Sequence, residues 1–310
     1  MLLSFALVAG LVTAPAPVPV PHEYVALGDS WSADVSVTHV TTAYVPSGCA
    51  QSTYDYPHQV SAALGIRAFR DATCGGATTR DMTGKQDVTR VPHLFDGVNA
   101  PQFDRLTTTT DLVTLGIGGN DAGLAAAVGK CISLLPRATL IPGVTMPAPF
   151  GAPCKDKWVS GGVDRMSAAI AATGPRVAAA VDGIRQRSPR ARILLVNYLA
   201  GIRESGGGCY PYVPITDQDM TWLGQKLREL NAMLAGVAAN RRVELVDTYS
   251  GSRGHDVCRA PGTKWVEGLL PLTTDPLGPA IPFHPNKLGA NYQARAVLAT
   301  VNAGTPRSRV

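Results

Sequence analysis

Five short apolar segments limit the possible fold more than any other feature of this sequence. They are Tyr24–Leu27, Leu64–Phe69, Leu112–Leu115, Ile193–Val196 and Val243–Val246. Each segment is nearly continuous rather than alternating, which is typical of strands buried on both faces of a parallel sheet. We therefore expect an α/β fold, a three-layer α/β/α sandwich with a central five-stranded parallel sheet.

Segments with helical periodicity separate or follow these strands. Their apolar positions, spaced by three and four, are Val177, Val181 and Ile184, and then Met220, Leu223, Leu227, Leu230 and Leu234. Such spacing predicts helices with one apolar face. Thr216 with Asp219 predicts the capped start of the second helix, and Pro285 predicts the first turn of a last helix. In a sheet of this kind, ligands bind outside the carboxyl ends of the strands.

The two ends of the chain do not fit the strand–helix pattern. Residues 1–21 join an apolar start, MLLSFALVAGLVTA, to a Pro-rich stretch. The apolar start is too short to span a bilayer, so we interpret 1–21 as a signal peptide and leader, with a short buried strand or helix as the alternative. Residues 22–304 would then form one domain, followed by a polar tail at 305–310, and the protein would be secreted and extracellular.

Charge and cysteine usage exclude several kinds of partner. The net charge is +5, but the chain has no run of Lys or Arg, so we expect no nucleic-acid partner. Six cysteines in an exported chain indicate three disulfides, which could pair in fifteen ways. The pairing that closes the shortest loops joins Cys49 to Cys74, Cys131 to Cys154 and Cys209 to Cys258. Because the chain has no C-x-x-C or HExxH sequence, we expect no metal.

The segment Ala122–Pro153 interrupts the alternation of strands and helices. It is apolar, contains several Pro and Gly residues, and lies partly between Cys131 and Cys154. We expect a disulfide-closed loop or lid beside the end of the third strand. A surface excursion without a role is the alternative.

Residues that can carry chemistry follow the expected strand ends. Ser30 lies in GDSWS after the first strand, Gly76 in CGGATT after the second, and Asn120 in GGND after the third. His284 lies in FHPN, just before the last helix. Taken singly, a helix-capping Ser or a Gly-rich turn has an ordinary structural explanation. Together the four would bring a nucleophile, anion donors and a base to one edge of the sheet.

These four blocks, in this order, resemble those of the SGNH (GDSL) hydrolase family, most closely its secreted actinobacterial lipases and esterases. The resemblance implies the flavodoxin-like SGNH hydrolase fold, with Ser30 as nucleophile and His284 as general base. It also implies an oxyanion hole made by the backbone N–H groups of Ser30 and Gly76 and the side chain of Asn120. It implies no cofactor.

One position departs from the family pattern. Most members have an Asp three residues before the catalytic His, where this chain has Ile281. We therefore expect a Ser–His dyad, in which the carbonyl of Ile281 or Pro282 accepts a hydrogen bond from the imidazole of His284. An acid arriving from elsewhere, such as Asp275, would contradict this hypothesis. His255 is the rival base.

The expected function is that of a secreted serine carboxylic ester hydrolase. It would be a lipase or esterase that acts on triacylglycerol or short-chain acyl esters through an acyl-serine intermediate. The chain has no GxSxG sequence, which excludes the α/β-hydrolase elbow. A phospholipase, a carbohydrate acetylesterase and a non-catalytic secreted binding protein are the alternatives. We expect a monomer that binds a small-molecule or lipid ester and makes at most transient contact with a lipid interface.

Overall fold

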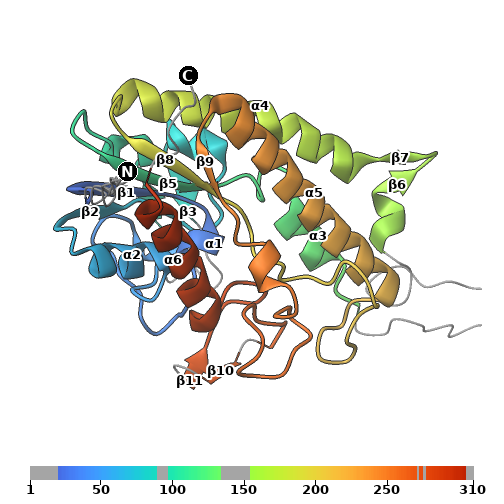
Figure 1. Cartoon of the computed structure of the whole chain (residues 1–310). Helices are drawn as coiled ribbons and strands as arrows, with labels where there is room; N and C mark the ends of the chain where they lie inside the picture. The colour runs from blue at the N-terminus through green and yellow to red at the C-terminus, as the bar shows by residue number, and fades with distance from the viewer. Residues whose placement is uncertain (1–19, 89–96, 134–153, 271, 275–276, 305–310) are drawn as a thin grey trace, which may run out of the picture.

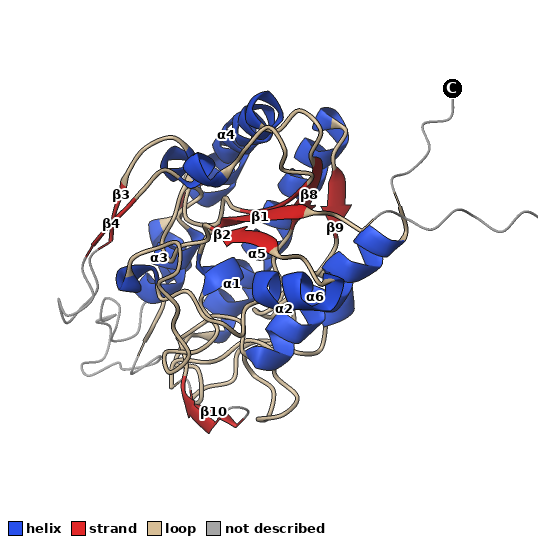
Figure 2. Cartoon of the chain, turned by 90° about the vertical axis from the view of Figure 1, so that its left-hand side faces the viewer, coloured by secondary structure: helices blue, strands red, loops and turns tan. Residues whose placement is uncertain are grey.

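A five-stranded parallel sheet forms the centre of the molecule, with strand order β2-β1-β5-β8-β9 (Figure 1). The computed structural model describes residues 20–88, 97–133, 154–270, 272–274 and 277–304. The sheet strands are β1 (Glu23–Gly28), β2 (Ala68–Asp71), β5 (Leu112–Gly116), β8 (Arg192–Val196) and β9 (Glu244–Val246). Helices cover both faces (Figure 2), so the predicted three-layer α/β/α fold is confirmed.

Alternation of side chains along each strand divides the core between the two faces of the sheet. The helices are α1 (Ser30–Ala33), α2 (Tyr56–Leu64), α3 (Leu124–Lys130), α4 (Arg165–Arg187), α5 (Asp217–Arg241) and α6 (Lys287–Asn302). Val25 and Leu27 of β1 pack in the cluster that contains α3, α4 and α5. Tyr24 and Ala26, from the same strand, pack in the cluster that contains α2 and α6. Because successive side chains of a strand point to opposite faces, this one strand contributes to both cores.

Two predicted elements begin later than the sequence suggested. The second strand was expected at Leu64–Phe69, but Leu64 ends α2 and Gly65 caps it in the left-handed region, with φ of 65°. A helix that ends on such a glycine leaves the chain free to enter β2 only a few residues later. The last helix was expected to have Pro285 in its first turn. Instead Asn286 caps α6, and Pro285 forms an isolated bridge with Val266.

The start of α5 agrees with the prediction, and a close contact follows within the first third of the helix. The Thr216 hydroxyl accepts a hydrogen bond from the Asp219 backbone N–H at 3.1 Å. One turn further on, a Cβ at Gly224 would collide with the backbone of Arg203 and Glu204, in the loop after β8. A glycine at this position therefore lets α5 lie directly against that loop.

Short hairpins and 3-10 turns lie in the loops between these elements. They are the hairpins β3 (Gln86–Val88) with β4 (Gly97–Asn99), β6 (Val159–Ser160) with β7 (Val163–Asp164), and β10 (Leu272–Thr274) with β11 (Leu277–Pro279), and the 3-10 turns Ser47–Cys49, Thr79–Met82, Gln102–Arg105, Cys154–Lys157 and Ser250–Ser252. Three disulfides join Cys49 to Cys74, Cys131 to Cys154 and Cys209 to Cys258. Among the described helices, none is both long enough and apolar enough to cross a bilayer. Most of the expected leader and the tail at 305–310 lie outside the described residues.

Candidate active site

Ser30 begins helix α1 directly after the exit turn of β1. A Cβ on Gly28 would lie 2.7 Å from the carbonyl oxygen of Gly116, so only glycine fits where the two neighbouring strands end. The amide of Gln102 holds this turn, because it accepts from the Gly28 N–H at 2.8 Å and donates to the Gly28 carbonyl at 2.9 Å. The helix is capped by Asp29 rather than by Ser30, which leaves the Ser30 hydroxyl free of the capping role.

A cavity of about 330 Å³ brings four of the predicted site residues together: Ser30, Asn120, Pro282 and His284. Its walls are largely apolar. They include Leu124, Ala125, Val128 and Ile132 in and after α3, and Leu227 and Leu230 of α5. The segment from Ala122, predicted to be a loop or lid, thus contains the helix α3, which lines the cavity. The part of that segment at 134–153 lies outside the described residues.

Gly76 lies in the loop after β2 and is exposed, but it is not among the residues that line this cavity. It has φ of +78°, a conformation that glycine adopts without strain. Within the described part of the chain, neither the Ser30 N–H nor the Gly76 N–H donates to a protein acceptor. Both groups are therefore available to an anion.

Two contacts tie the Gly76 loop to the Asn120 loop. The Asn120 side chain donates one N–H to the Ala77 carbonyl at 2.8 Å, which leaves its second N–H for another acceptor. The carboxylate of Asp121 accepts from the Thr79 N–H at 2.9 Å and from the Thr79 hydroxyl at 2.5 Å. Side chains at or next to the candidate anion donors thus fix the positions of the two loops relative to each other.

Tyr198 is a site residue that the sequence did not single out. Its hydroxyl donates to the Asp29 carboxylate at 2.5 Å and accepts from the Gly119 N–H at 2.8 Å, so it bridges the residues before Ser30 and before Asn120. Burial raises the pKa of Asp29 to about 7, although the Tyr198 hydrogen bond opposes that rise. Tyr198 follows β8, and the rule that ligands lie at the carboxyl ends of strands could have pointed to it.

The imidazole of His284 faces a main-chain carbonyl. Its Nδ1 lies 2.7 Å from the Pro282 carbonyl oxygen. A carbonyl can only accept a hydrogen bond, so Nδ1 carries a proton, and in the neutral imidazole Nε2 then keeps a lone pair. The Ile281 carbonyl, the other predicted acceptor, instead receives the His284 backbone N–H at 3.3 Å. Asp275 lies outside the described residues.

The backbone around His284 is fixed by Glu267. The Phe283 N–H donates to the Glu267 carbonyl, and the Glu267 N–H donates to the His284 carbonyl, each at 3.0 Å. Asn286, the cap of α6, donates to the Glu267 carboxylate at 2.8 Å. Phe283 has φ of 59°, an unusual conformation for a residue with a side chain, and the bonds on either side hold it there.

The ring of His255, the rival base, is held in place by neighbouring residues. Its ring stacks on Trp265 with centroids 3.7 Å apart, and its Nδ1 lies 2.6 Å from the Thr263 carbonyl. It is not among the residues that line the cavity with Ser30. The geometry thus favours His284 as the base.

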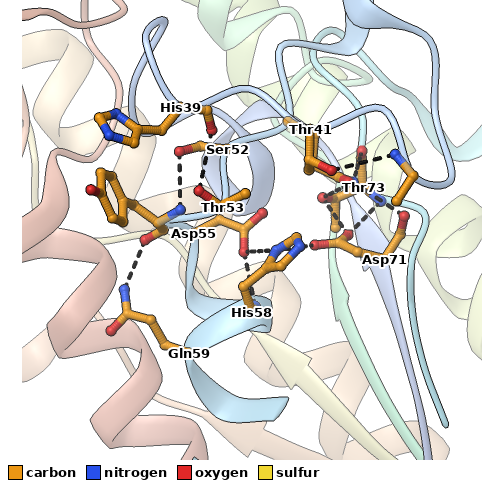
Figure 3. Close-up of polar contacts among 12 residues, drawn as sticks. His39, Thr41, Ser52, Thr53, Asp55, His58, Gln59, Asp71 and Thr73 are labelled. Carbon is orange, nitrogen blue, oxygen red and sulfur yellow. Dashed lines mark hydrogen bonds and ion pairs between the residues drawn. The ribbon is translucent and has the colours of Figure 1, made fainter. Parts of the chain in front are cut away.

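A second titratable cluster surrounds His58, and its Asp71 ends β2, the strand that leads to the Gly76 loop. His58 lies between two fully buried carboxylates, with Nδ1 2.7 Å from Asp55 and 3.4 Å from Asp71 (Figure 3). Asp71 also accepts from the Thr73 N–H and hydroxyl, and Thr73 directly precedes Cys74. Burial disfavours the charged imidazole, but the two carboxylates outweigh it and raise the pKa of His58 to about 10.

Two groups of described side chains have the atom types and spacing of metal ligands. One is Asp55, His58 and Asp71, where the imidazolium already supplies the positive charge between the carboxylates. The other combines Asp219 with Cys131 and Cys154. These two cysteines form a disulfide and so offer no thiolate.

A profile of the GDSL-like Lipase/Acylhydrolase family matches residues 26–292. The chain belongs to this family. It is also 36% identical over 287 residues to "Lipase 2" of Streptomyces coelicolor, a match that covers 92% of this chain and 88% of the relative. Membership of the GDSL-like family identifies the protein as a carboxylic ester hydrolase.

Two solved structures have the same fold. Phospholipase A1 from Streptomyces albidoflavus NA297 superposes with a TM-score of 0.67 and 23% identity, over 90% of this chain and 99% of that chain. The extracellular lipase from Streptomyces rimosus superposes with a TM-score of 0.61 and 24% identity, over 91% and 99%. At these identities the likeness establishes the three-layer GDSL fold alone.

Proposed function

We propose that Ser30 is the nucleophile of this hydrolase and His284 its general base. The observation that carries the proposal is the shared cavity of Ser30 and His284, together with the Pro282 contact, which in a neutral imidazole places the proton on Nδ1 and the lone pair on Nε2. Nε2 takes the Ser30 proton as Oγ attacks the ester carbonyl carbon. The proton then passes to the leaving alcohol, and water releases the acid from the acyl-serine by the same two steps.

The oxyanion of the tetrahedral intermediate would be stabilised by three donors: the backbone N–H groups of Ser30 and Gly76 and the second side-chain N–H of Asn120. Such donors contribute most when they are fixed before the reaction begins. The contacts from Asp121 and Tyr198 support this role, since they hold the donor-bearing loops in place without occupying the donors.

The substrate would be an acyl ester of a lipid, a triacylglycerol or a short-chain ester. An apolar wall between α3 and α5 suits a hydrocarbon chain better than a polar sugar. The name of the Streptomyces coelicolor relative, "Lipase 2", supports this substrate class. A carbohydrate acetylesterase is disfavoured by the same apolar wall.

We also infer that the protein is secreted as one domain, residues 22–304, and works as a monomer. The apolar start of the chain and three disulfides support export, because disulfides persist outside the cytoplasm.

The test compares purified mature protein with its Ser30→Ala variant on p-nitrophenyl esters of increasing acyl length. The wild type is expected to turn over, and the variant to lose essentially all activity while keeping its circular dichroism spectrum. The profile over acyl length separates an esterase from a lipase. Equal activity of the two proteins would show that Ser30 is not the nucleophile, and a wild type silent on all esters would contradict the substrate class.

A further inference from the structure

A second cavity, of about 320 Å³, adjoins the one that contains Ser30. It lies between the loop after β8, at 200–206, and the loop after β9, at 249–259, and hence at the carboxyl edge of the sheet. Ile202 lines both cavities, so the two cavities are neighbours at this residue. The two cavities could therefore receive two parts of one ligand.

Guanidinium groups outnumber carboxylates around this second cavity. Arg203 and Arg259 both pair with Asp256, at 3.2 and 3.4 Å. Arg253 pairs with Glu204 at 3.6 Å, and Arg228, just outside the lining, pairs with the same carboxylate at 3.0 Å. Four positive charges share two negative ones, so a net positive potential remains at the cavity.

The arginines also keep hydrogen-bond donors for a ligand. Arg203 and Arg259 approach Asp256 through Nε. Their terminal N–H groups donate to no acceptor among the residues that the structure describes. A guanidinium presents its N–H groups as a planar fork that matches two oxygens of a phosphate, so these donors suit that kind of anion.

The cavity is fixed before any ligand arrives. The Cys209–Cys258 disulfide joins its two loops, and the Val257 N–H donates to the Gly201 carbonyl at 3.0 Å. The side chain of Arg203 is only 26% exposed, which limits its freedom. A charged group held in place loses little conformational entropy when it binds an anion.

We propose that this arginine cavity, lined by Arg203, Arg253 and Arg259, is a phosphate subsite beside the ester-hydrolysis cavity. The phosphate belongs either to the headgroup of a phospholipid whose acyl chain occupies the Ser30 cavity, or to free inorganic phosphate. The headgroup source rests on the proposed function, whereas the binding of inorganic phosphate does not depend on it.

The test uses the double variant Arg253→Gln/Arg259→Gln. Both side chains are exposed, and their loss leaves Arg203 on Asp256 and Arg228 on Glu204, so neither carboxylate becomes unpaired. Arg190→Gln is the matched control, because Arg190 is exposed and precedes β8, at the opposite edge of the sheet.

Two measurements are made at constant ionic strength. Isothermal titration with inorganic phosphate is expected to give a Kd about tenfold weaker in the double variant than in wild type or Arg190→Gln, as the loss of charged hydrogen bonds predicts. Hydrolysis of dioctanoyl phosphatidylcholine is expected to lose about tenfold in kcat/KM, while that of dioctanoylglycerol stays unchanged.

A change in both measurements supports a phosphate subsite that takes the headgroup, and a change in phosphate binding alone supports a site for free phosphate. The proposal is overturned if the double variant binds phosphate like the wild type and keeps the same ratio of activities on the two esters. It is also overturned if both esters lose activity equally and phosphate binding is unchanged. A wild type inactive on both esters contradicts the proposed function, and the titration still decides the phosphate subsite.

Discussion

At the scale of single residues, the proposed site would rely on neutral backbone groups where many serine hydrolases use a carboxylate. The proposed orienting group for the imidazole of His284 is a carbonyl, that of Pro282, 2.7 Å from Nδ1. Two of the three proposed oxyanion donors are main-chain N–H groups, so Asn120 is the only proposed donor that a substitution can remove directly. The effect of replacing Asn120 on the rate of ester hydrolysis is therefore the most direct test of the oxyanion assignment.

Asn120→Ala is expected to lower kcat by about 10²–10³-fold, the usual loss for one oxyanion donor. The same change removes the bond to the Ala77 carbonyl, which should lower the free energy of unfolding by only about 1 kcal/mol. Steady-state kinetics on a p-nitrophenyl ester, with urea unfolding as control, separates the two effects. A kcat within twofold of wild type would exclude Asn120 from the oxyanion hole.

The His58 cluster predicts how stability depends on pH. The folded protein raises the pKa of His58 to about 10, against about 6.5 for an unfolded chain. The protonated imidazole therefore binds more tightly in the folded state. Its contribution to stability is complete below about pH 6.5 and is lost as the pH rises toward 10.

His58→Gln should destabilise the protein most near pH 6.5, by roughly 3 kcal/mol, because it leaves the buried carboxylates of Asp55 and Asp71 without their cation. The difference from wild type should shrink steadily up to pH 10 in urea unfolding curves. His22→Gln, at an exposed position, is the control and should show no such trend. A difference that grows with pH would contradict a charged imidazole at this position.

At the scale of elements, the glycines of α5 have opposite roles. Gly224 lies where the helix touches the backbone of the loop after β8, whereas a Cβ at Gly236 would meet nothing within 4 Å. Helix propensity alone favours alanine at both positions, by about 1 kcal/mol. At Gly224 the close contact makes alanine destabilising, because the atoms that its Cβ would meet belong to a backbone that cannot rotate away.

Gly236→Ala is therefore expected to raise the free energy of unfolding by about 0.5–1 kcal/mol. Gly224→Ala should lower it by about 2 kcal/mol, since the loop that carries Arg203 must move away. Chemical denaturation of the two variants and the wild type gives both values. Equal effects of the two substitutions would mean that α5 does not contact that loop as closely as described.

At the scale of the whole molecule, the long apolar patterns and the short motifs around Ser30, Asn120 and His284 were predictable, whereas residues that act through distant contacts were not. The apolar runs around Tyr24–Leu27 and Leu112–Leu115 predicted the sheet, because buried strands need continuous hydrophobic sequence. The start of β2 could not be predicted, since Gly65 ends α2 just before it. Tyr198 and Glu267 were missed because their roles depend on contacts with residues far away in the sequence.

Ser30 follows the first strand and His284 precedes the last helix, so nearly the whole chain separates the two groups that must meet. A growing polypeptide that ends before His284 has the proposed nucleophile but not the proposed base. An enzyme built this way would acquire its activity only once synthesis is almost complete. The order of the residues along the chain would thus delay hydrolysis until nearly the whole domain has been made.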